Sequence, residues 1–367
     1  MFRRVLARAS EDRLLLVLLA ALVPLLWFTP ESDWALHQLV DWKTVGALAG
    51  LMMLSRGLEE SGYLAYTGQW LLQRVRGVRL LAIVLVLFSA CLAAVITNDV
   101  ALFIVVPLTL SLRRIADIPV GRLVIFEALA VNAGSALSPV GNPQNLFLWQ
   151  ASGAGFLEFM LMMAPLALAL TVLLIIVVPL AFSGGVISVC GVAVDVPRER
   201  GLFWVSLLLY SPFLLLADEG YAAFAAVGLI VFFLVYRRRL LAGVDWLLLL
   251  VFALMFIDVS LLARLPVVRD AADGLLQMPG QTLTAAVLGS QVMSNVPAAI
   301  FLTSFSEEWR DLAWGVTVGG FGLAIGSLAN LIALRLARQP GLWREFHYWS
   351  VPALLGGWLI AIALGAL

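Results

Sequence analysis

The 367-residue sequence is poor in charge and in the residues that build enzyme and metal sites. Only 13% of its residues are charged, and it has two cysteines and two histidines. Two cysteines are too few for a disulfide framework or a thiolate metal site, and no HExxH or GxSxG motif occurs. The formal net charge is zero, which gives no reason to expect a nucleic-acid partner. We therefore expect neither an enzyme nor a resident metal or cofactor.

What the sequence has in abundance is apolar residues. They make up 62% of the chain, and the mean hydropathy is +1.02, which is typical of a polytopic membrane protein. Basic residues precede the first apolar segment, but no small-residue cleavage site follows, so we expect a first spanning helix and no signal peptide. About nine spans of suitable length are expected, at 14–30, 43–58, 123–150, 157–182, 201–217, 220–236, 246–263, 312–334 and 347–367.

Two further apolar stretches, 80–112 and 281–305, are interrupted at their middles by polar residues. In the second stretch, the apolar segments before and after the interruption are too short to cross a bilayer. We expect helical hairpins that enter and leave the membrane on the same side. For the first stretch this interpretation depends partly on its similarity to the second.

The two halves of the chain share three landmarks in the same order. Val-Asp-Trp occurs at 40–42 and at 244–246, TND at 97–99 is matched by SNVP at 294–297, and GSALSPVGNPQNL from Gly134 is matched by GGFGLAIGSLANL from Gly319. One odd span lies between the halves, so the second copy enters from the opposite face. The sequence predicts an all-α inverted-repeat transporter, with a first repeat at 14–182, a connecting segment at 183–219 and a second repeat at 220–367.

The distribution of positive charge predicts the orientation of the chain. With a cytoplasmic N-terminus, only Lys43, Arg264, Arg269 and Arg310 of the 23 basic residues lie outside. This bias follows the positive-inside rule and places the C-terminus outside.

Polar residues gather at both hairpin tips and in two regions where a helix should break. Proline and glycine at 134–145 disfavour a continuous helix, and a broken helix exposes backbone groups that can bind ions. Single polar residues also serve as contacts between membrane helices, and Asn132 and Ser135 fit that role. We define the first half-site as the tip at 97–99 with the break at 138–145, and the second as the tip at 294–297 with the break at 326–330. The candidate binding residues are Thr97, Asn98, Ser138, Gly141, Asn142, Pro143, Asn145, Ser294, Asn295, Pro297, Gly326, Ser327 and Asn330.

Three acidic residues fall within expected spans or hairpins, where an unpaired charge is costly. Asp99 is the leading candidate for coupling to protons or cations, and Asp258, with no basic residue within one turn, is the second. Glu127 is either a third coupling residue or the partner of Arg122 at the membrane edge. No Lys or Arg occurs in the polar clusters.

These motifs resemble the ion transporter superfamily that includes ArsB arsenite permeases, NhaD sodium/proton antiporters, citrate transporters and divalent anion/sodium symporters. TNDVAL at 97–102 resembles the ArsB-type tip, and SNVP and GNPQN resemble the symporter tips and breaks. The resemblance implies an elevator-like cycle and often a homodimer. The symporter-type tip is usually Ser-Asn-Thr, so Val296 removes a hydroxyl that such tips use for sodium.

We therefore expect a secondary transporter of a small inorganic or carboxylate anion, coupled to H+ or Na+, in a bacterial inner membrane. Arsenite efflux and sodium/proton antiport are the alternatives within the superfamily. An intramembrane enzyme would need a catalytic motif that the sequence lacks. A non-transporting receptor gives no reason for two broken helices.

Overall fold

The computed structural model describes residues 13–29, 35–112, 118–186, 197–276 and 281–365. These residues are helical throughout, apart from turns and an isolated bridge between Gly77 and Val186. The basic residues before Arg13, and Cys190, lie outside the described part of the chain, whereas Cys91 is exposed on a helix. The all-α class predicted from the sequence is confirmed.

The first half of the chain contains a hairpin followed by a broken helix. Its helices are α2 (Arg13–Phe28), α3 (Leu36–Leu39), α4 (Trp42–Glu60), α5 (Tyr63–Leu72), α6 (Val78–Val95), α7 (Asn98–Leu112), α8 (Val120–Ser135), α9 (Pro143–Ser152) and α10 (Phe156–Ala181). Helices α6 and α7 meet at Thr97, and α8 and α9 are separated by 136–142, which we call the first break.

After α11 (Arg200–Asp218), the second half repeats this order of elements. Its helices are α12 (Ala222–Gly243), α13 (Trp246–Arg264), α14 (Pro266–Leu276), α15 (Gln281–Met293), α16 (Asn295–Leu302), α17 (Trp309–Gly319), η2 (Ala324–Gly326), α18 (Leu328–Ala337) and α19 (Leu342–Gly365). Residues 320–327 form the second break. Helices α15 and α16 have 13 and 8 residues, about 20 and 12 Å, so this hairpin is too short to cross a bilayer, as predicted.

The repeated Val-Asp-Trp sequence marks the start of one helix in each half. The Asp41 carboxylate accepts hydrogen bonds from the backbone of Lys43 and Thr44 at the start of α4. Asp245 does the same for Leu248 at the start of α13. An aspartate at this position satisfies backbone N–H groups that have no partner within the helix. The repeat therefore conserves a helix start rather than a ligand.

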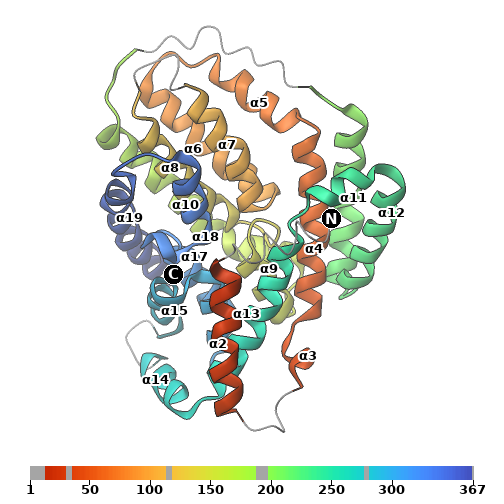
Figure 1. Cartoon of the computed structure of the whole chain (residues 1–367). Coiled ribbons are helices and arrows are strands. Elements are labelled where there is room, and N and C mark those ends of the chain that lie inside the picture. The colour runs from red at the N-terminus through yellow and green to blue at the C-terminus, as the bar shows by residue number, and fades with distance from the viewer. Residues whose placement is uncertain (1–12, 30–34, 113–117, 187–196, 277–280, 366–367) are drawn as a thin grey trace.

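The first helix of each half packs against the helix of the other half that follows the Val-Asp-Trp sequence, α2 against α13 and α12 against α4. Figure 1 shows α11 and α12 beside α4 on one side of the molecule, and α2 beside α13. The hairpins, the broken helices, α10 and α19 form the other side, with α9 and α18 near the centre. We call this second group the bundle.

Close backbone contacts join each hairpin to the broken helix of its own half. A side chain at Gly134 in α8 would come within 2.0 Å of the Ala90 carbonyl oxygen in α6. A side chain at Gly315 in α17 would come within 2.4 Å of the Leu283 carbonyl oxygen in α15. Only glycine permits these approaches, so hairpin and broken helix form one packed unit in each half.

Five described helices are long and apolar enough to cross a membrane: Val78–Val95, Phe156–Ala181, Arg200–Asp218, Trp246–Arg264 and Leu342–Gly365. Four of these five coincide with expected spans, whereas Val78–Val95 is the first helix of the stretch 80–112, which was expected to be a hairpin and not a span. The other expected spans fall on α2, α4, α12 and the two broken helices. Helices α4 and α12 carry charged residues near one end, where an ion-pair cluster lies. The chain is an integral membrane protein.

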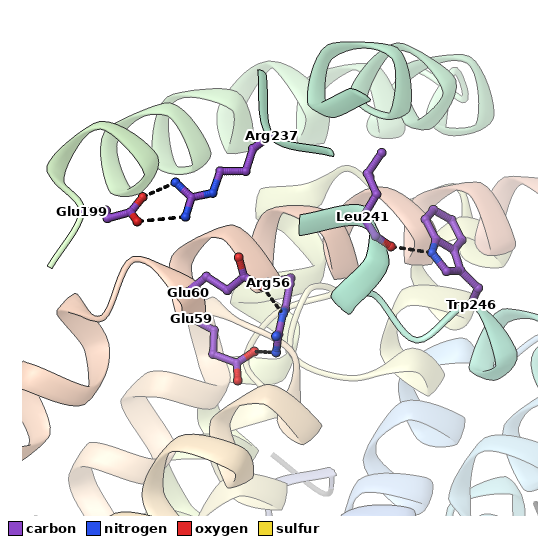
Figure 2. Close-up of polar contacts among 7 residues, drawn as sticks. All are labelled: Arg56, Glu59, Glu60, Glu199, Arg237, Leu241 and Trp246. Atoms are coloured by element: carbon purple, nitrogen blue, oxygen red, sulfur yellow. Dashed lines mark hydrogen bonds and ion pairs between the residues drawn. The ribbon is translucent and has the colours of Figure 1, made fainter. Parts of the chain in front are cut away.

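Figure 2 shows two groups of ion pairs at the ends of α4, α11 and α12. Arg56 binds Glu59 at 2.9 Å and Glu60 at 3.0 Å on its own helix, and Arg237 binds Glu199 at the start of α11. Arg237 is also the point at which α12 bends, with φ −157° and ψ 72°. The bend directs this arginine towards α11, and its ion pair with Glu199 ties α12 to the start of α11.

Candidate functional site

A pocket lies between the two half-sites and the helices α4 and α13. The empty space in and around it amounts to about 470 Å³, a volume that includes open solvent at its mouth. Its lining residues come from both hairpin tips, both breaks, α4 and α13: Leu48, Met52, Thr97, Asn98, Asp99, Pro143, Gln144, Leu248, Phe252, Asn295, Val296, Ser327, Leu328, Ala329 and Ile332. The structure therefore brings together the two regions that the sequence predicts to face each other.

Four helices begin at this pocket. Helix α7 begins at Asn98, α9 at Pro143, α16 at Asn295 and α18 at Leu328, and each of these residues lines the pocket. The first N–H groups of a helix have no partner within it, and the helix dipole makes this end positive. Each of these ends contributes a positive partial charge to the pocket lining, which also contains the carboxylate of Asp99. Pro143 has no N–H, and the backbone N–H groups of Asn98 and Asp99 donate to the Gly141 carbonyl and to the Asn98 side chain. In the described chain, no Lys, Arg or His lines this pocket.

Helices α16 and α18 begin without a side-chain cap in the described structure. Ser294 and Ser327 stand at their N-cap positions, but neither hydroxyl accepts a bond from the first turn. By contrast, the side-chain oxygen of Asn142 caps α9 by accepting a hydrogen bond from the backbone N–H of Asn145 at 2.8 Å. The second half-site therefore keeps backbone donors that a ligand can bind.

The first hairpin tip is fixed to the first break by two hydrogen bonds. The backbone N–H of Asn98 donates to the Gly141 carbonyl at 2.8 Å, and the Ser138 hydroxyl donates to the Ala94 carbonyl at 2.7 Å. The tip thus lies at the depth of the break. Ser138 and Gly141 shape the first half-site without lining the pocket.

The asparagines of the first break bind each other and the adjacent backbone. Asn142 donates to the Ser135 hydroxyl at 3.1 Å, and Asn145 donates to the Ala136 carbonyl at 2.9 Å. These amides support the non-helical backbone of the break. They lie behind Pro143 and Gln144, which face the pocket.

The second hairpin is fixed to the second break by Gln291 instead. Its amide donates to the Gly319 carbonyl at 2.8 Å and accepts from the Leu323 amide at 2.7 Å. Gly326 ends η2, where a side chain would come within 2.8 Å of the Gly319 carbonyl oxygen. Pro297 lies in the first turn of α16, half-buried.

His347 supports the second break from α19. Its Nε2 accepts a hydrogen bond from the Ala324 amide at 3.2 Å, and its Nδ1 contacts the Trp343 carbonyl at 2.7 Å. A carbonyl can only accept and a backbone N–H can only donate, so in this arrangement Nδ1 is the donor and Nε2 the acceptor. No pattern in the sequence indicates these hydrogen bonds.

The three acidic candidates lie in different surroundings. Asp99 lines the pocket at the start of α7. Glu127 is fully buried within the bundle, where it accepts from the Thr109 hydroxyl, and its second oxygen has no partner among the described residues. Asp258 is buried in α13, and neither of its oxygens has a partner in the part of the chain that the structure describes; neither it nor Glu127 lines the pocket.

One expected pairing is wrong. Arg122 does not pair with Glu127 but with Glu345 of α19, at 2.7 Å, and it also donates to the Ala181 carbonyl at 2.6 Å. The tertiary packing of α8 against α19 and α10 supplies partners far along the chain, and sequence spacing gives no information about them.

Several pocket residues were missed by the sequence analysis. Leu48, Met52, Leu248 and Phe252 form one face of the pocket, which we call the apolar wall. Nothing distinguishes them in the sequence from residues that face lipid. Gln144 sits inside the predicted GNPQN motif and could have been included. No three His, Cys, Asp or Glu residues gather in the described chain as a metal site would require.

The sequence and the fold of the chain are similar to those of known proteins. The sequence model of the citrate transporter family, CitMHS, matches residues 10–319. The chain belongs to this family. CitMHS proteins are part of the ion transporter superfamily, so the resemblance stated from the motifs is confirmed, and this member is a membrane transporter.

Full-length relatives support this membership. The chain is 44% identical over 356 residues to the inner membrane protein YbiR of Escherichia coli, covering 96% of this chain and 95% of the relative. It is 33% identical over 305 residues to the transporter MJ0456 of Methanocaldococcus jannaschii, covering 82% of each. The YdaH transporter of Alcanivorax borkumensis has a similar fold, with a TM-score of 0.57, 18% identity, and coverage of 90% of this chain and 88% of YdaH.

Proposed function

We propose that this CitMHS protein is a secondary active transporter of a small inorganic or carboxylate anion, coupled to H+ or Na+. The observation that carries the proposal is the convergence of four helix N-termini on one pocket. Helix N-termini bind anions through backbone N–H groups and the helix dipole. Their positive potential compensates the charge of a solute in a pocket that has no basic side chain in the described chain.

The candidate binding residues fall into two groups under this proposal. Thr97, Asn98, Pro143, Asn295 and Ser327 line the pocket and would contact the solute directly. The remaining candidates hold the two breaks and tips in position through the hydrogen bonds and close contacts described above.

Asp99 is the proposed coupling residue. It is the acidic residue of the described pocket lining, beside the amides that would bind the anion. A carboxylate at that position repels an anion unless it is protonated or paired with a cation. Entry of the anion together with H+ or Na+ removes that repulsion, which is the physical basis of coupling. Asp258 and Glu127 are further candidates, each buried and short of hydrogen-bond partners.

Alternating access would follow from movement of the bundle against the apolar wall. The polar half-sites belong to the hairpins and broken helices, which glycine contacts join into packed units. The wall presents Leu48, Met52, Leu248 and Phe252, which make no directional bonds. Along the wall itself the bundle can change its register without breaking hydrogen bonds, which supports an elevator-like cycle. The movement would break two hydrogen bonds to α11, from the Gln150 side chain to the Ala217 carbonyl and from the Phe156 backbone N–H to the Asp218 carboxylate, both at 3.1 Å.

Arsenite efflux is the second candidate. The specific observation is that Asp99 lies in a pocket lining without Lys or Arg. A neutral metalloid hydroxide would meet less repulsion there than a multiply charged anion. Arsenite tolerance of a sensitive host that expresses the chain separates the two candidates.

We further propose that the protein lies in the inner membrane with its N-terminus in the cytoplasm and its C-terminus outside. The excess of basic residues on one side of the expected spans supports this orientation. Association into a homodimer would anchor α11 and α12, on the far side of α4 from the pocket, while the bundle moves.

Solute flux tests the proposal. Purified protein in liposomes is assayed for uptake of labelled phosphate, sulfate, citrate and arsenite under an imposed H+ or Na+ gradient. We expect flux of at least one anion, reduced at least tenfold by Asn98→Ala and unchanged by Gln38→Ala, an exposed amide on α3. Asp99→Asn should retain binding and lose gradient dependence. Absence of flux for every anion under both gradients would refute anion transport.

A further inference from the structure

Asn132 lies in α8, one turn before the first break, and 4% of its surface is exposed. All of its side-chain hydrogen bonds go to the second repeat. Its amide nitrogen donates to the Gly320 carbonyl at 3.1 Å and to the Asn330 side-chain oxygen at 2.9 Å, and its oxygen accepts from the Ser327 hydroxyl at 3.0 Å. The asparagines of the first break, by contrast, bind within their own repeat.

The direction of donation in each of these hydrogen bonds is fixed, because two of them end on a backbone carbonyl. The Gly320 carbonyl can only accept, and it receives hydrogen bonds from both Asn132 and Asn330, the latter at 2.8 Å. The amide nitrogens of both asparagines must therefore face Gly320. The Asn132 oxygen then faces Ser327, and the Ser327 hydroxyl must give its hydrogen to it.

As a result, the Ser327 hydroxyl can only accept a hydrogen bond from any further partner. A serine hydroxyl has one hydrogen and two acceptor lone pairs, and here the hydrogen is committed to Asn132. Ser327 lines the pocket at the start of α18. A group that binds this hydroxyl from the pocket must donate a hydrogen bond. The backbone N–H groups at the nearby helix starts are donors, so a group that binds them must accept a hydrogen bond.

The second repeat does not supply an equivalent of this contact. Matching Gly134 with Gly319 places Thr317 opposite Asn132. The Thr317 hydroxyl is buried and has no hydrogen-bond partner among the described residues. The two half-sites therefore differ. The Ser327 hydroxyl of the second half-site donates its hydrogen to the other repeat, and among the described residues no equivalent hydrogen bond from Thr317 reaches the first half-site.

We infer that Asn132 makes Ser327 a hydrogen-bond acceptor in the pocket, so that the transporter selects anions that retain an O–H group. Hydroxycarboxylates and protonated inorganic oxyacids share this chemistry. Their deprotonated oxygens suit the helix N-termini, and their O–H donates to Ser327. A fully deprotonated anion without a hydroxyl leaves Ser327 unpaired in a buried site, which weakens its binding. The inference depends on the proposed anion transport.

Matched pairs of anions test the inference by thermal stabilisation of the purified protein. The pairs are citrate and tricarballylate, malate and succinate, and hydrogenphosphate and sulfate; only the first member of each pair has an O–H. The first two pairs report on hydroxycarboxylates and the third on inorganic oxyacids. We expect the first member of at least one pair to bind about tenfold more tightly to the wild-type protein.

Three variants identify the source of that preference. Ser327→Ala and Asn132→Leu should bind both members of the pair about equally, whereas Ser327→Thr should keep the preference. Ser327→Ala removes one hydroxyl, so it decides the question even where Asn132→Leu does not fold. Equal binding of the pair by the wild-type protein, or an unchanged preference in Ser327→Ala, would overturn the inference while leaving anion transport intact. Stabilisation by none of the six anions would count against anion transport itself and against this inference with it.

Discussion

Replacement of Ser294 by glycine should stabilise the protein. Ser294 forms the second hairpin tip with φ 73° and ψ 158°, a backbone region that almost only glycine occupies. No hydrogen bond of its side chain caps α16, while its backbone binds Ser290 and Ala298. The substitution therefore changes mainly the backbone preference at this position.

The expected gain follows from two opposing effects. Relief of a strained backbone position contributes about 1–3 kcal/mol. The greater freedom of glycine in the unfolded chain costs about 0.5–1 kcal/mol. The free energy of unfolding should rise by about 1 kcal/mol, with a range of about 0–2.5 kcal/mol.

The assay is reversible unfolding of purified protein in mixed detergent, comparing Ser294→Gly with Ser294→Ala. Both variants remove the hydroxyl, but alanine retains the strain, so the difference between them isolates the backbone effect. Thr97, the corresponding tip residue of the first hairpin, does not have a positive φ. Thr97→Gly should therefore destabilise the protein. If Ser294→Gly were no more stable than Ser294→Ala, the tip would not be strained and the reasoning would fail.

Three further predictions concern the bundle and α13. Gly134→Ala should lower the free energy of unfolding by at least about 3 kcal/mol, because its side chain would overlap a carbonyl oxygen of the facing helix; Gly228→Ala, which meets nothing within 4 Å, is the control in the same unfolding assay. His347→Ala should speed hydrogen exchange at Ala324 at constant pH, because it removes the acceptor of that amide; mass spectrometry should show no such change in Gln38→Ala, and equal exchange at Ala324 in wild type and His347→Ala would contradict it. Asp258→Leu should raise the melting temperature, corresponding to about 1–3 kcal/mol, because both carboxylate oxygens are buried without partners; a lower melting temperature would indicate an interaction that the carboxylate makes in the folded protein.

Local sequence chemistry predicted the places where the helices break. Proline, glycine and asparagine at 139–145 disfavour a helix whatever surrounds them, and the break is found there. Asp41 and Asp245 mark helix starts for a similarly local reason. The pairing of the two half-sites followed from the internal repeat, which constrains tertiary structure more strongly than composition does.

What could not be predicted depends on packing between distant segments. Asn132 resembles any polar residue in a membrane helix until Gly320, Ser327 and Asn330 are placed around it. The partner of Arg122 lies 223 positions away, and spacing along one helix gives no information about it. Buried apolar residues are indistinguishable by type from lipid-facing ones, which hid the apolar wall.

The apolar wall has a consequence for ion leakage. A conduit for protons or sodium needs a continuous file of water or of polar groups, and the wall side chains that line the pocket contribute no polar group to such a file. In the proposed elevator-like cycle, the bundle carries its solute along a surface that offers no hydrogen-bonding side chain to an ion. The coupling ion then crosses the membrane only together with the moving, solute-loaded pocket, so the ion gradient is not dissipated by leakage.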